Sequence, residues 1–338
     1  VDCCESGSTL RFLIPLAALT GRPVAFTGRG RLMQRPQSVY QELFASQGLR
    51  FEQEGDTLTV AGPLRPGCFS LAGDVSSQFI SGLLFALPLL DGDSRLRLKP
   101  PVESRSYIEM TRASQSRFGV SSAWLDEYTL AVPGGQAYRP RDMAIEGDWS
   151  QVAFPAALGV LAGDVTVTGL EPGTLQGDAV ILDILRRCGG RAEAVPGGVR
   201  FQKSALHGTK IDLADCPDLG PILMALGLLC EGETVIANAG RLRLKESDRI
   251  AAMEQELRKL GGQIESDGGT VTIRRSVLHA PAGPLWGHND HRVVMSLTVL
   301  AAAAGLPVQI DGAEAVAKSW PGFFAAVRQL GVEVQTDA

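Results

Sequence analysis

The sequence lacks several features that would assign it to a class of protein directly. It contains no run of about eighteen uncharged apolar residues, so we expect no segment to span a membrane. Its first residues (VDCCE) are not the basic and then apolar start of a signal peptide, and we expect a cytoplasmic protein. Lys and Arg number 32 against 37 Asp and Glu, a net charge of −5, and they form no basic runs. Such a chain is a poor nucleic-acid binder, and an anionic ligand would need a local cluster of basic residues.

Cysteine is scarce and is not spaced as metal ligands are. We interpret the cysteines as reduced structural thiols of a cytosolic protein. The six are Cys3, Cys4, Cys68, Cys188, Cys216 and Cys230.

What the sequence does contain is a repeat. A helix-like run that closes on glycine occurs five times, and the closing glycines lie 71, 70, 72 and 70 residues apart. Each glycine falls where a left-handed helix C-cap would be placed. The runs are residues 37–48, 106–119, 178–189, 248–261 and 321–331.

A second, more apolar helix precedes each of these runs. Helices that are apolar nearly all round are normally buried. We expect them at 8–19, 76–90, 150–162, 219–230 and 291–304, followed by strands at 23–28, 94–98, 165–170, 233–239 and 307–312. Most units close with a strand pair, such as 49–62 or 262–275, so the predicted unit is βαβαββ and the predicted fold class is α/β (α+β).

The segments before the buried helices are candidate ligand sites. Gly7-Ser8 and Ser76-Ser77-Gln78 offer hydroxyls and backbone N–H groups suited to a phosphate. Ser, Asp and Asn are also ordinary helix N-caps, and that alternative stays open. Arg292 follows Asp290 at a helix start, where the helix dipole disfavours a cation, which indicates a nearby anion.

The loops before the second helices are rich in Arg and Lys, which indicates a polyanionic ligand. Two carboxylates near them are candidate bases, Asp218 and Glu246, although Asp218 is equally well placed to cap a helix. The polar residues in these loops are Arg29, Arg31, Arg35, Ser104, Arg105, Arg241, Arg243, Lys245, Arg249 and Lys318.

Eight ordered motifs resemble the 5-enolpyruvylshikimate-3-phosphate synthase family along the whole chain. They are ESGSTLR at 5–11, GRLMQRP at 30–36, SSQF at 76–79, SRSY at 104–107, CPD at 216–218, RLKESDR at 243–249, NDHR at 289–292 and AKSWP at 317–321. The resemblance implies an inside-out fold of two similar domains, each of three βαβαββ units, with the active site in the cleft between them. Five of six units are present here: two in an upper domain, 1–144, and three in a lower domain, 145–338, whose last unit is incomplete without the N-terminal strand.

The resemblance also implies an activity. Members transfer the enolpyruvyl group of phosphoenolpyruvate to the 5-hydroxyl of shikimate 3-phosphate and release phosphate, a step toward chorismate and the aromatic amino acids. Matching motif positions place shikimate 3-phosphate against Ser76, Ser77, Gln78, Ser104, Tyr107, Asp218, Arg241 and Lys245. They place phosphoenolpyruvate against Gly7, Arg35, Gln78, Arg249, Arg292 and Lys318.

The same resemblance assigns catalytic roles. Asp218 would act as the base toward the hydroxyl, Glu246 would transfer the proton at the methylene carbon, and Lys318 would complete the catalytic set. It implies no metal and no organic cofactor, a monomer, and inhibition by glyphosate. A side chain at Gly7 should exclude glyphosate, which is slightly longer than phosphoenolpyruvate.

Two departures from the family pattern leave alternatives open. The family's first unit carries a Lys-Ser segment and an Arg that touch both substrates, and without them we expect weak binding and little or no turnover. An incomplete fragment that binds without turnover is therefore one alternative. A UDP-N-acetylglucosamine enolpyruvyl transferase, which shares the fold and the donor, is another, although the usual loop cysteine of that enzyme has no counterpart in GRLMQRP. Arg241 stands where many relatives carry Asn, so its contact with substrate is a looser assignment.

Overall fold

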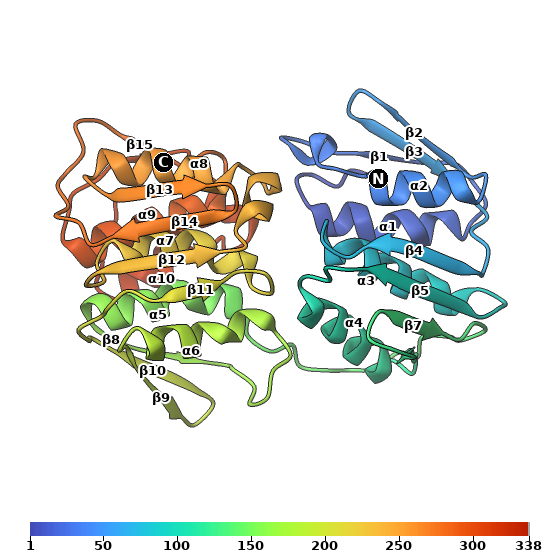
Figure 1. Cartoon of the computed structure of the whole chain (residues 1–338), viewed down its shortest axis with the longest axis horizontal. Helices are drawn as coiled ribbons and strands as arrows, with labels where there is room; N and C mark the ends of the chain where they lie inside the picture. Colours follow the sequence, from blue (N-terminus) through green and yellow to red (C-terminus); the bar gives the residue numbers. More distant parts are fainter. Residues whose placement is uncertain (337–338) are drawn as a thin grey trace. The chain divides into compact units, whose positions relative to one another are not determined.

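The computed structural model describes residues 1–336 and divides the chain into two compact units, Val1–Ala144 and Ile145–Ala338. Each unit has its own hydrophobic core. In Figure 1 the first unit runs from blue to green and the second from green to red.

The first unit holds two repeats. The first repeat comprises α1 (Gly7–Ala18), β1 (Val24–Thr27), the 3₁₀ turn η1 (Leu32–Gln34), α2 (Ser38–Ser46), β2 (Arg50–Glu54) and β3 (Thr57–Ala61). The second comprises β4 (Cys68–Ala72), α3 (Ser77–Ala86), η2 (Leu87–Leu89), β5 (Ser94–Lys99), α4 (Arg105–Arg117), β6 (Ala123–Trp124) and β7 (Thr129–Val132). Their sheets have the strand orders β1-β3-β2 and β4-β5-β7-β6, and only the β4–β5 pairing is parallel.

The two apolar helices of this unit, α1 and α3, pack against each other. They approach closely because α3 carries Gly82 at the contact, beside the backbone of Arg11 on α1 and the hydroxyl of Tyr40. That hydroxyl lies 2.8 Å from the carbonyl oxygen of Arg11 and 3.0 Å from that of Phe79, so one buried phenol joins both helices. The strands bury alternate residues, as in β5, because one face of the sheet covers the helices.

The second unit holds three repeats. The first comprises α5 (Trp149–Ala162), β8 (Asp164–Thr168), η3 (Gly177–Val180), α6 (Ile181–Arg187), β9 (Arg191–Val195) and β10 (Gly198–Gln202). The second comprises β11 (Lys210–Asp212), η4 (Pro217–Leu219), α7 (Gly220–Gly227), β12 (Glu233–Ala237), η5 (Gly240–Leu244), α8 (Arg249–Lys259), β13 (Gln263–Asp267) and β14 (Thr270–Arg274). The third comprises β15 (Leu285–Trp286), α9 (His291–Ala304), β16 (Ile310–Asp311), η6 (Ala313–Lys318) and α10 (Phe323–Gln329).

The apolar helices α5, α7 and α9 contact one another at the centre of this unit. Its sheets have the strand orders β8-β10-β9, β11-β12-β14-β13 and β15-β16. Figure 1 shows the strands of the four-stranded sheet side by side. Helices inside and sheets outside follow from the sequence, since the central helices are apolar on every side.

The predicted helices are confirmed, and so is the role of the closing glycines. All five have a left-handed backbone, with φ between 68° and 88°, a conformation that costs glycine little. They are Gly48, Gly119, Gly189, Gly261 and Gly331.

The strand prediction for 307–312 was partly wrong, because only Ile310–Asp311 pairs within it. Among the described residues, no strand pair follows α10 in this last repeat. All four strands of the predicted βαβαββ unit are present in two repeats, in the sheets β4-β5-β7-β6 and β11-β12-β14-β13. In the first repeat, the opening strand is reduced to a parallel bridge between Asp2 and Thr27.

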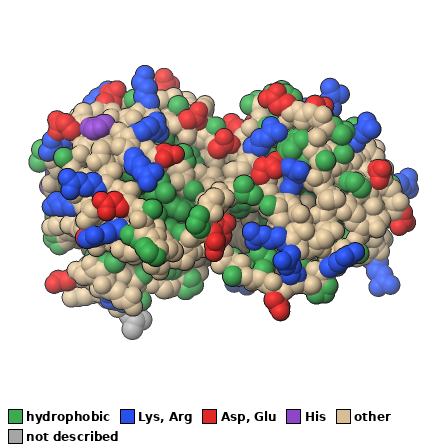
Figure 2. Space-filling model, turned by 90° about the horizontal axis from the view of Figure 1, so that it is seen from below, with side chains coloured by type: hydrophobic (Ala, Val, Ile, Leu, Met, Phe, Trp, Pro, Cys, Tyr) green, Lys and Arg blue, Asp and Glu red, His purple; other side chains and the backbone are tan. Residues whose placement is uncertain are grey.

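Charges of both signs are mixed on the surface. Figure 2 shows Lys and Arg interspersed with Asp and Glu on the face of each unit in view. Attraction of an anion on this face therefore depends on local clusters.

Among residues 1–336, no helix has the length and apolar character needed to cross a membrane.

The close helix contact in the first unit yields a stability prediction. We expect Gly82→Ala to lower the free energy of unfolding by about 1–3 kcal/mol, because the new methyl group would clash with the Arg11 carbonyl and the Tyr40 hydroxyl. Chemical denaturation followed by circular dichroism measures this. Gly67→Ala is the control, since its Cβ would meet nothing within 4 Å; equal stability of the two variants would contradict the packing argument.

Candidate active site

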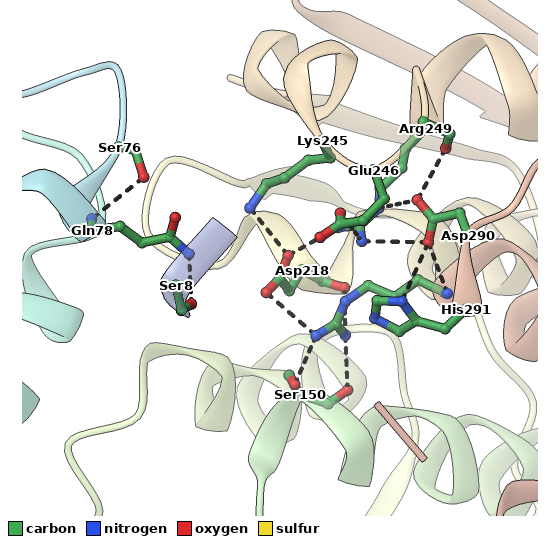
Figure 3. A network of polar contacts seen from close by, with 12 residues as sticks. Ser8, Ser76, Gln78, Ser150, Asp218, Lys245, Glu246, Arg249, Asp290 and His291 are labelled. Atoms are coloured by element: carbon green, nitrogen blue, oxygen red, sulfur yellow. Dashed lines mark hydrogen bonds and ion pairs between the residues drawn. The ribbon is translucent and has the colours of Figure 1, made fainter. Parts of the chain in front are cut away.

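Three of the polar residues predicted in the first unit, Ser8, Ser76 and Gln78, lie together at the starts of α1 and α3. Arg11 is buried, and its guanidinium donates to the Gln78 side-chain oxygen at 2.9 Å and to Ser76 Oγ at 3.4 Å. The Gln78 amide nitrogen then donates to Ser8 Oγ at 2.9 Å. Arg11 thus sets which end of the Gln78 amide faces Ser8. Figure 3 shows the hydrogen bond between Gln78 and Ser8.

The starts of α1 and α3 are capped by serines, as the open alternative suggested. Ser76 Oγ accepts from the backbone N–H of Gln78, and Ser6 Oγ accepts from that of Thr9. Capping does not exclude binding, because a serine hydroxyl that accepts from a backbone N–H still has a proton to donate.

Gly7 begins α1 directly beside the Arg35 guanidinium. A Cβ atom on Gly7 would lie 2.8 Å from an Arg35 terminal nitrogen. The absence of a side chain at this position therefore lets Arg35 lie against the helix start.

Ser104 and Tyr107 lie at the start of α4. Ser104 is buried and has a left-handed backbone with φ 56°, and its carbonyl accepts from the Tyr107 N–H at 3.1 Å. The neighbouring Arg105 stacks over the Trp124 ring, 4.1 Å from its centroid, and donates to the carbonyl of Glu127.

In the second unit the predicted residues converge on Asp218, as Figure 3 shows. Its carboxylate does not cap a helix; it accepts from Arg249 at 2.9 Å and from Lys245 at 3.3 Å. Arg292 donates to the other carboxylate oxygen at 3.3 Å. The N-cap interpretation of Asp218 was therefore wrong, and the anion that Arg292 was expected to meet is, within this chain, Asp218.

Burial and charge act in opposite directions on this cluster. Burial by itself would raise the pKa of Asp218, but the three cations outweigh burial and hold this pKa well below its usual range. Asp218 is therefore ionised at neutral pH. Burial lowers the pKa of Lys245; the positive charges of Arg249 and Arg241 act in the same direction, and the charge of Asp218 opposes them.

Arg249 is almost completely enclosed, with its side chain 1% exposed. It donates through Nε to Asp290 at 2.8 Å and through a terminal nitrogen to Glu246 at 2.8 Å, in addition to Asp218. Burial would lower the pKa of Arg249, but the surrounding carboxylates raise it above its ordinary value. One guanidinium thus holds three carboxylates in a fixed arrangement.

The remaining predicted residues lie on loops of the same unit. Lys318, at the end of η6, donates to the carbonyl oxygen of Asn289 at 2.7 Å. Arg241 lies in η5, close enough for its charge to act on Lys245.

Some of the basic residues expected to line a ligand site have partners elsewhere. Arg29 pairs with Asp2 at the surface, and Arg243 pairs with Asp248, the N-cap of α8. With Arg105 stacked on Trp124, three of the basic positions serve local structure.

Four further residues belong to these clusters and were not predicted. The sequence could have indicated Arg11, because it is a lone cation within an apolar helix. Asp290 caps α9 and binds Arg249, and Ser150 Oγ accepts from Arg292 at 2.9 Å. His291 is buried, with Nδ1 3.9 Å from the Asp290 carboxylate, and burial together with the charge of Arg292 lowers the pKa of His291 to about 4.

Within residues 1–336, no group of three or more His, Cys, Asp or Glu is arranged to hold a metal ion. The clusters are built instead from cations, carboxylates and hydroxyls.

Comparison with known proteins identifies the family. The family model for EPSP synthase (3-phosphoshikimate 1-carboxyvinyltransferase) matches residues 1–327. The chain belongs to the EPSP synthase family. The 3-phosphoshikimate 1-carboxyvinyltransferase of Clostridium kluyveri is 42% identical over 336 residues, which cover 99% of this chain and 79% of the relative. That of Clostridium novyi is 40% identical over 334 residues, covering 98% and 76%.

Solved structures agree on the fold. An EPSP synthase from Acinetobacter baumannii matches with a TM-score of 0.76 at 21% identity, covering 97% of this chain and 78% of that one. The enolpyruvyl transferase NikO from Streptomyces tendae matches with a TM-score of 0.67 at 16% identity, covering 99% and 95%. The predicted enolpyruvyl transferase fold is therefore confirmed.

The depressed pKa of His291 predicts how this EPSP synthase family member responds to acid. The unfolded chain binds a proton on this ring near its ordinary pKa of 6.5, whereas the folded chain binds it only near about 4. The contribution of His291 to the free energy of unfolding should thus be lost as pH falls from 6.5 to 4, by up to about 3 kcal/mol.

Urea denaturation at several pH values measures this slope. His291→Asn should flatten it, and the same substitution at the exposed His207 controls for the loss of a histidine. A slope that His291→Asn leaves unchanged would contradict the burial argument.

Proposed function

We propose that this chain transfers the enolpyruvyl group of phosphoenolpyruvate to the 5-hydroxyl of shikimate 3-phosphate, with the clusters described above as the binding and catalytic groups. The observation that carries the proposal is the ionised Asp218 carboxylate, which the three cations Lys245, Arg249 and Arg292 contact. Such a group can accept a proton while its cations bind the negative charges of two substrates.

Shikimate 3-phosphate would be held by hydroxyls, backbone N–H groups and cations. In the first unit, the N-terminus of α3 offers backbone N–H groups and the Ser76 hydroxyl to an anion. In the second, Lys245 and Arg241 supply charge, and Asp218 would accept a hydrogen bond from the sugar. The full set is Ser76, Ser77, Gln78, Ser104, Tyr107, Asp218, Arg241 and Lys245.

Phosphoenolpyruvate carries a carboxylate and a phosphate, and both need cations. Arg249 and Arg292 are buried with fixed partners, so they are already oriented before any ligand binds. The full set is Gly7, Arg35, Gln78, Arg249, Arg292 and Lys318.

The proposed reaction uses these groups in turn. Glu246 gives a proton to the methylene carbon of phosphoenolpyruvate, and C2 becomes cationic. The 5-hydroxyl oxygen forms a bond to C2 and gives its proton to Asp218. Loss of a proton from the methyl carbon, with Glu246 as the acceptor, restores the double bond as the C2–O bond to phosphate breaks. Lys318 would stabilise the charge that develops on the phosphate.

Substrate binding would also improve Asp218 as a base. Three cations hold its pKa low in the unliganded protein. Anions bound to the same cations would offset part of their charge and raise this pKa, which makes the carboxylate a better proton acceptor.

The role of Asp218 can be measured directly. We expect Asp218→Asn to lower kcat by roughly 10²–10⁴-fold, because an amide cannot accept the hydroxyl proton. Release of inorganic phosphate from the two substrates gives the rate, and the unmodified chain is assayed with UDP-N-acetylglucosamine as the competing acceptor.

Asp164→Asn is the control, since that aspartate pairs with Arg200 in an exposed ion pair. Retention of kcat in Asp218→Asn, or turnover of the nucleotide sugar alone, would refute the proposal.

Glyphosate sensitivity tests the Gly7 position. The added methyl group of Gly7→Ala would lie 2.8 Å from an Arg35 nitrogen, so Arg35 must move and the space beside it narrows. We expect a higher KM for phosphoenolpyruvate and a larger rise in the glyphosate concentration that halves activity. Gly163→Ala, where a Cβ would meet nothing within 4 Å, is the control; unchanged inhibition of Gly7→Ala would count against this placement.

A further inference from the structure

A second buried ionic cluster lies on α8, away from Asp218. Glu256 is fully buried, and its carboxylate accepts from Lys259 Nζ at 2.7 Å and from the Trp286 backbone N–H at 2.9 Å. Its other oxygen lies 3.1 Å from His288 Nε2. A fully buried carboxylate is tolerated only when it is paired and hydrogen-bonded, so these donors together stabilise it.

Glu256 and Arg249 are seven residues apart on α8, which places both on one face of the helix. Arg249 holds Asp290, and Glu256 contacts His288. The segment from 288 to 290 is therefore attached to a single helix at both of its ends.

The segment between these attachments has an uncommon backbone. His288 and Asn289 are both left-handed, with φ of 51° and 53°. Two consecutive non-glycine residues in this region carry a conformational cost, so the surrounding contacts must maintain them. This geometry directs the Asn289 carbonyl oxygen to Lys318 Nζ at 2.7 Å.

We propose that Glu256 and His288 form a positioning pair, whose hydrogen bond maintains the left-handed segment that orients Lys318 and Asp290. Neither residue touches the proposed reacting atoms; they act through Asn289 and Asp290. The kinetic consequence rests on the proposed function, whereas the geometry does not. The pair should affect phosphoenolpyruvate binding above all, since Lys318 and Arg249 belong to that set.

Two substitutions at position 288 separate the hydrogen bond from the backbone. Asn tolerates left-handed backbone geometry well. Its side chain, however, ends at the position of the ring Nδ1 atom and is too short for the amide nitrogen to reach Glu256. Gln places its amide nitrogen near the position of Nε2 and can donate to the carboxylate. We expect His288→Asn to raise the KM for phosphoenolpyruvate roughly tenfold, as for loss of a hydrogen bond to a charged group, and His288→Gln to restore most of the loss.

Glu256→Gln tests the partner. An amide cannot accept from all three donors, so we expect the same selective rise in the KM for phosphoenolpyruvate, with the KM for shikimate 3-phosphate unchanged. Combining Glu256→Gln with His288→Asn should add little to either change alone, because both remove one interaction. Glu265→Gln is the control, since Glu265 is exposed and pairs with Arg274 on the neighbouring strand.

Hydrogen exchange of the backbone amides at 287–292 provides a readout that needs no turnover. We expect faster exchange in His288→Asn and Glu256→Gln, and near-normal exchange in His288→Gln. The positioning pair is overturned if His288→Asn matches the unmodified chain in exchange and KM, if His288→Gln behaves like His288→Asn, or if the KM values of both substrates rise equally. If the unmodified chain does not turn over these substrates, the proposed function fails, and exchange alone decides the inference.

Discussion

Charge compensation around Arg249 is the interaction on which the second unit's polar cluster depends. A guanidinium with almost no exposure would be strongly unfavourable alone, and it is stable because Asp218, Glu246 and Asp290 surround it. The same contacts fix those three carboxylates and, through Asp218, the cations Lys245 and Arg292. The groups are therefore held in place by contacts within the chain, which would lower the cost of ordering them in the proposed reaction.

The repeat explains how distant residues meet within this unit. Each apolar helix starts at an equivalent place in its repeat, so α5, η4–α7 and α9 bring Ser150, Asp218 and Arg292 together. The second helix of the middle repeat adds Arg249 from its first residue. The scaffold supplies equivalent positions, and the side chains at those positions supply the chemistry. The first unit uses the same positions differently: its links are mainly hydrogen bonds of the Gln78 amide and serine hydroxyls, ordered by the buried Arg11.

The opposite effects of burial and of neighbouring cations on the pKa of Asp218 also bear on the activity of the EPSP synthase family. The cations that hold the pKa of Asp218 low also make its carboxylate a weak base. In the proposed reaction, anions bound to the same cations would offset part of their charge, and binding and catalysis would thereby be coupled. His291 lies beside this cluster and is kept neutral by burial and by Arg292, so it adds no further positive charge near neutral pH.

The sequence by itself determined the repeat, the order of helices and most strands, because apolar periodicity and closing glycines such as Gly119 and Gly261 are local signals. Its motifs also identified the family and most members of the polar clusters. Only the tertiary structure decided what individual side chains contact. Whether Asp218 caps a helix or meets three cations, and whether Arg105 faces a ligand or stacks on Trp124, depends on residues far away in the chain. The link from Glu256 to His288 spans 32 residues for the same reason: a buried charge selects its partners by proximity in space, which no local pattern records.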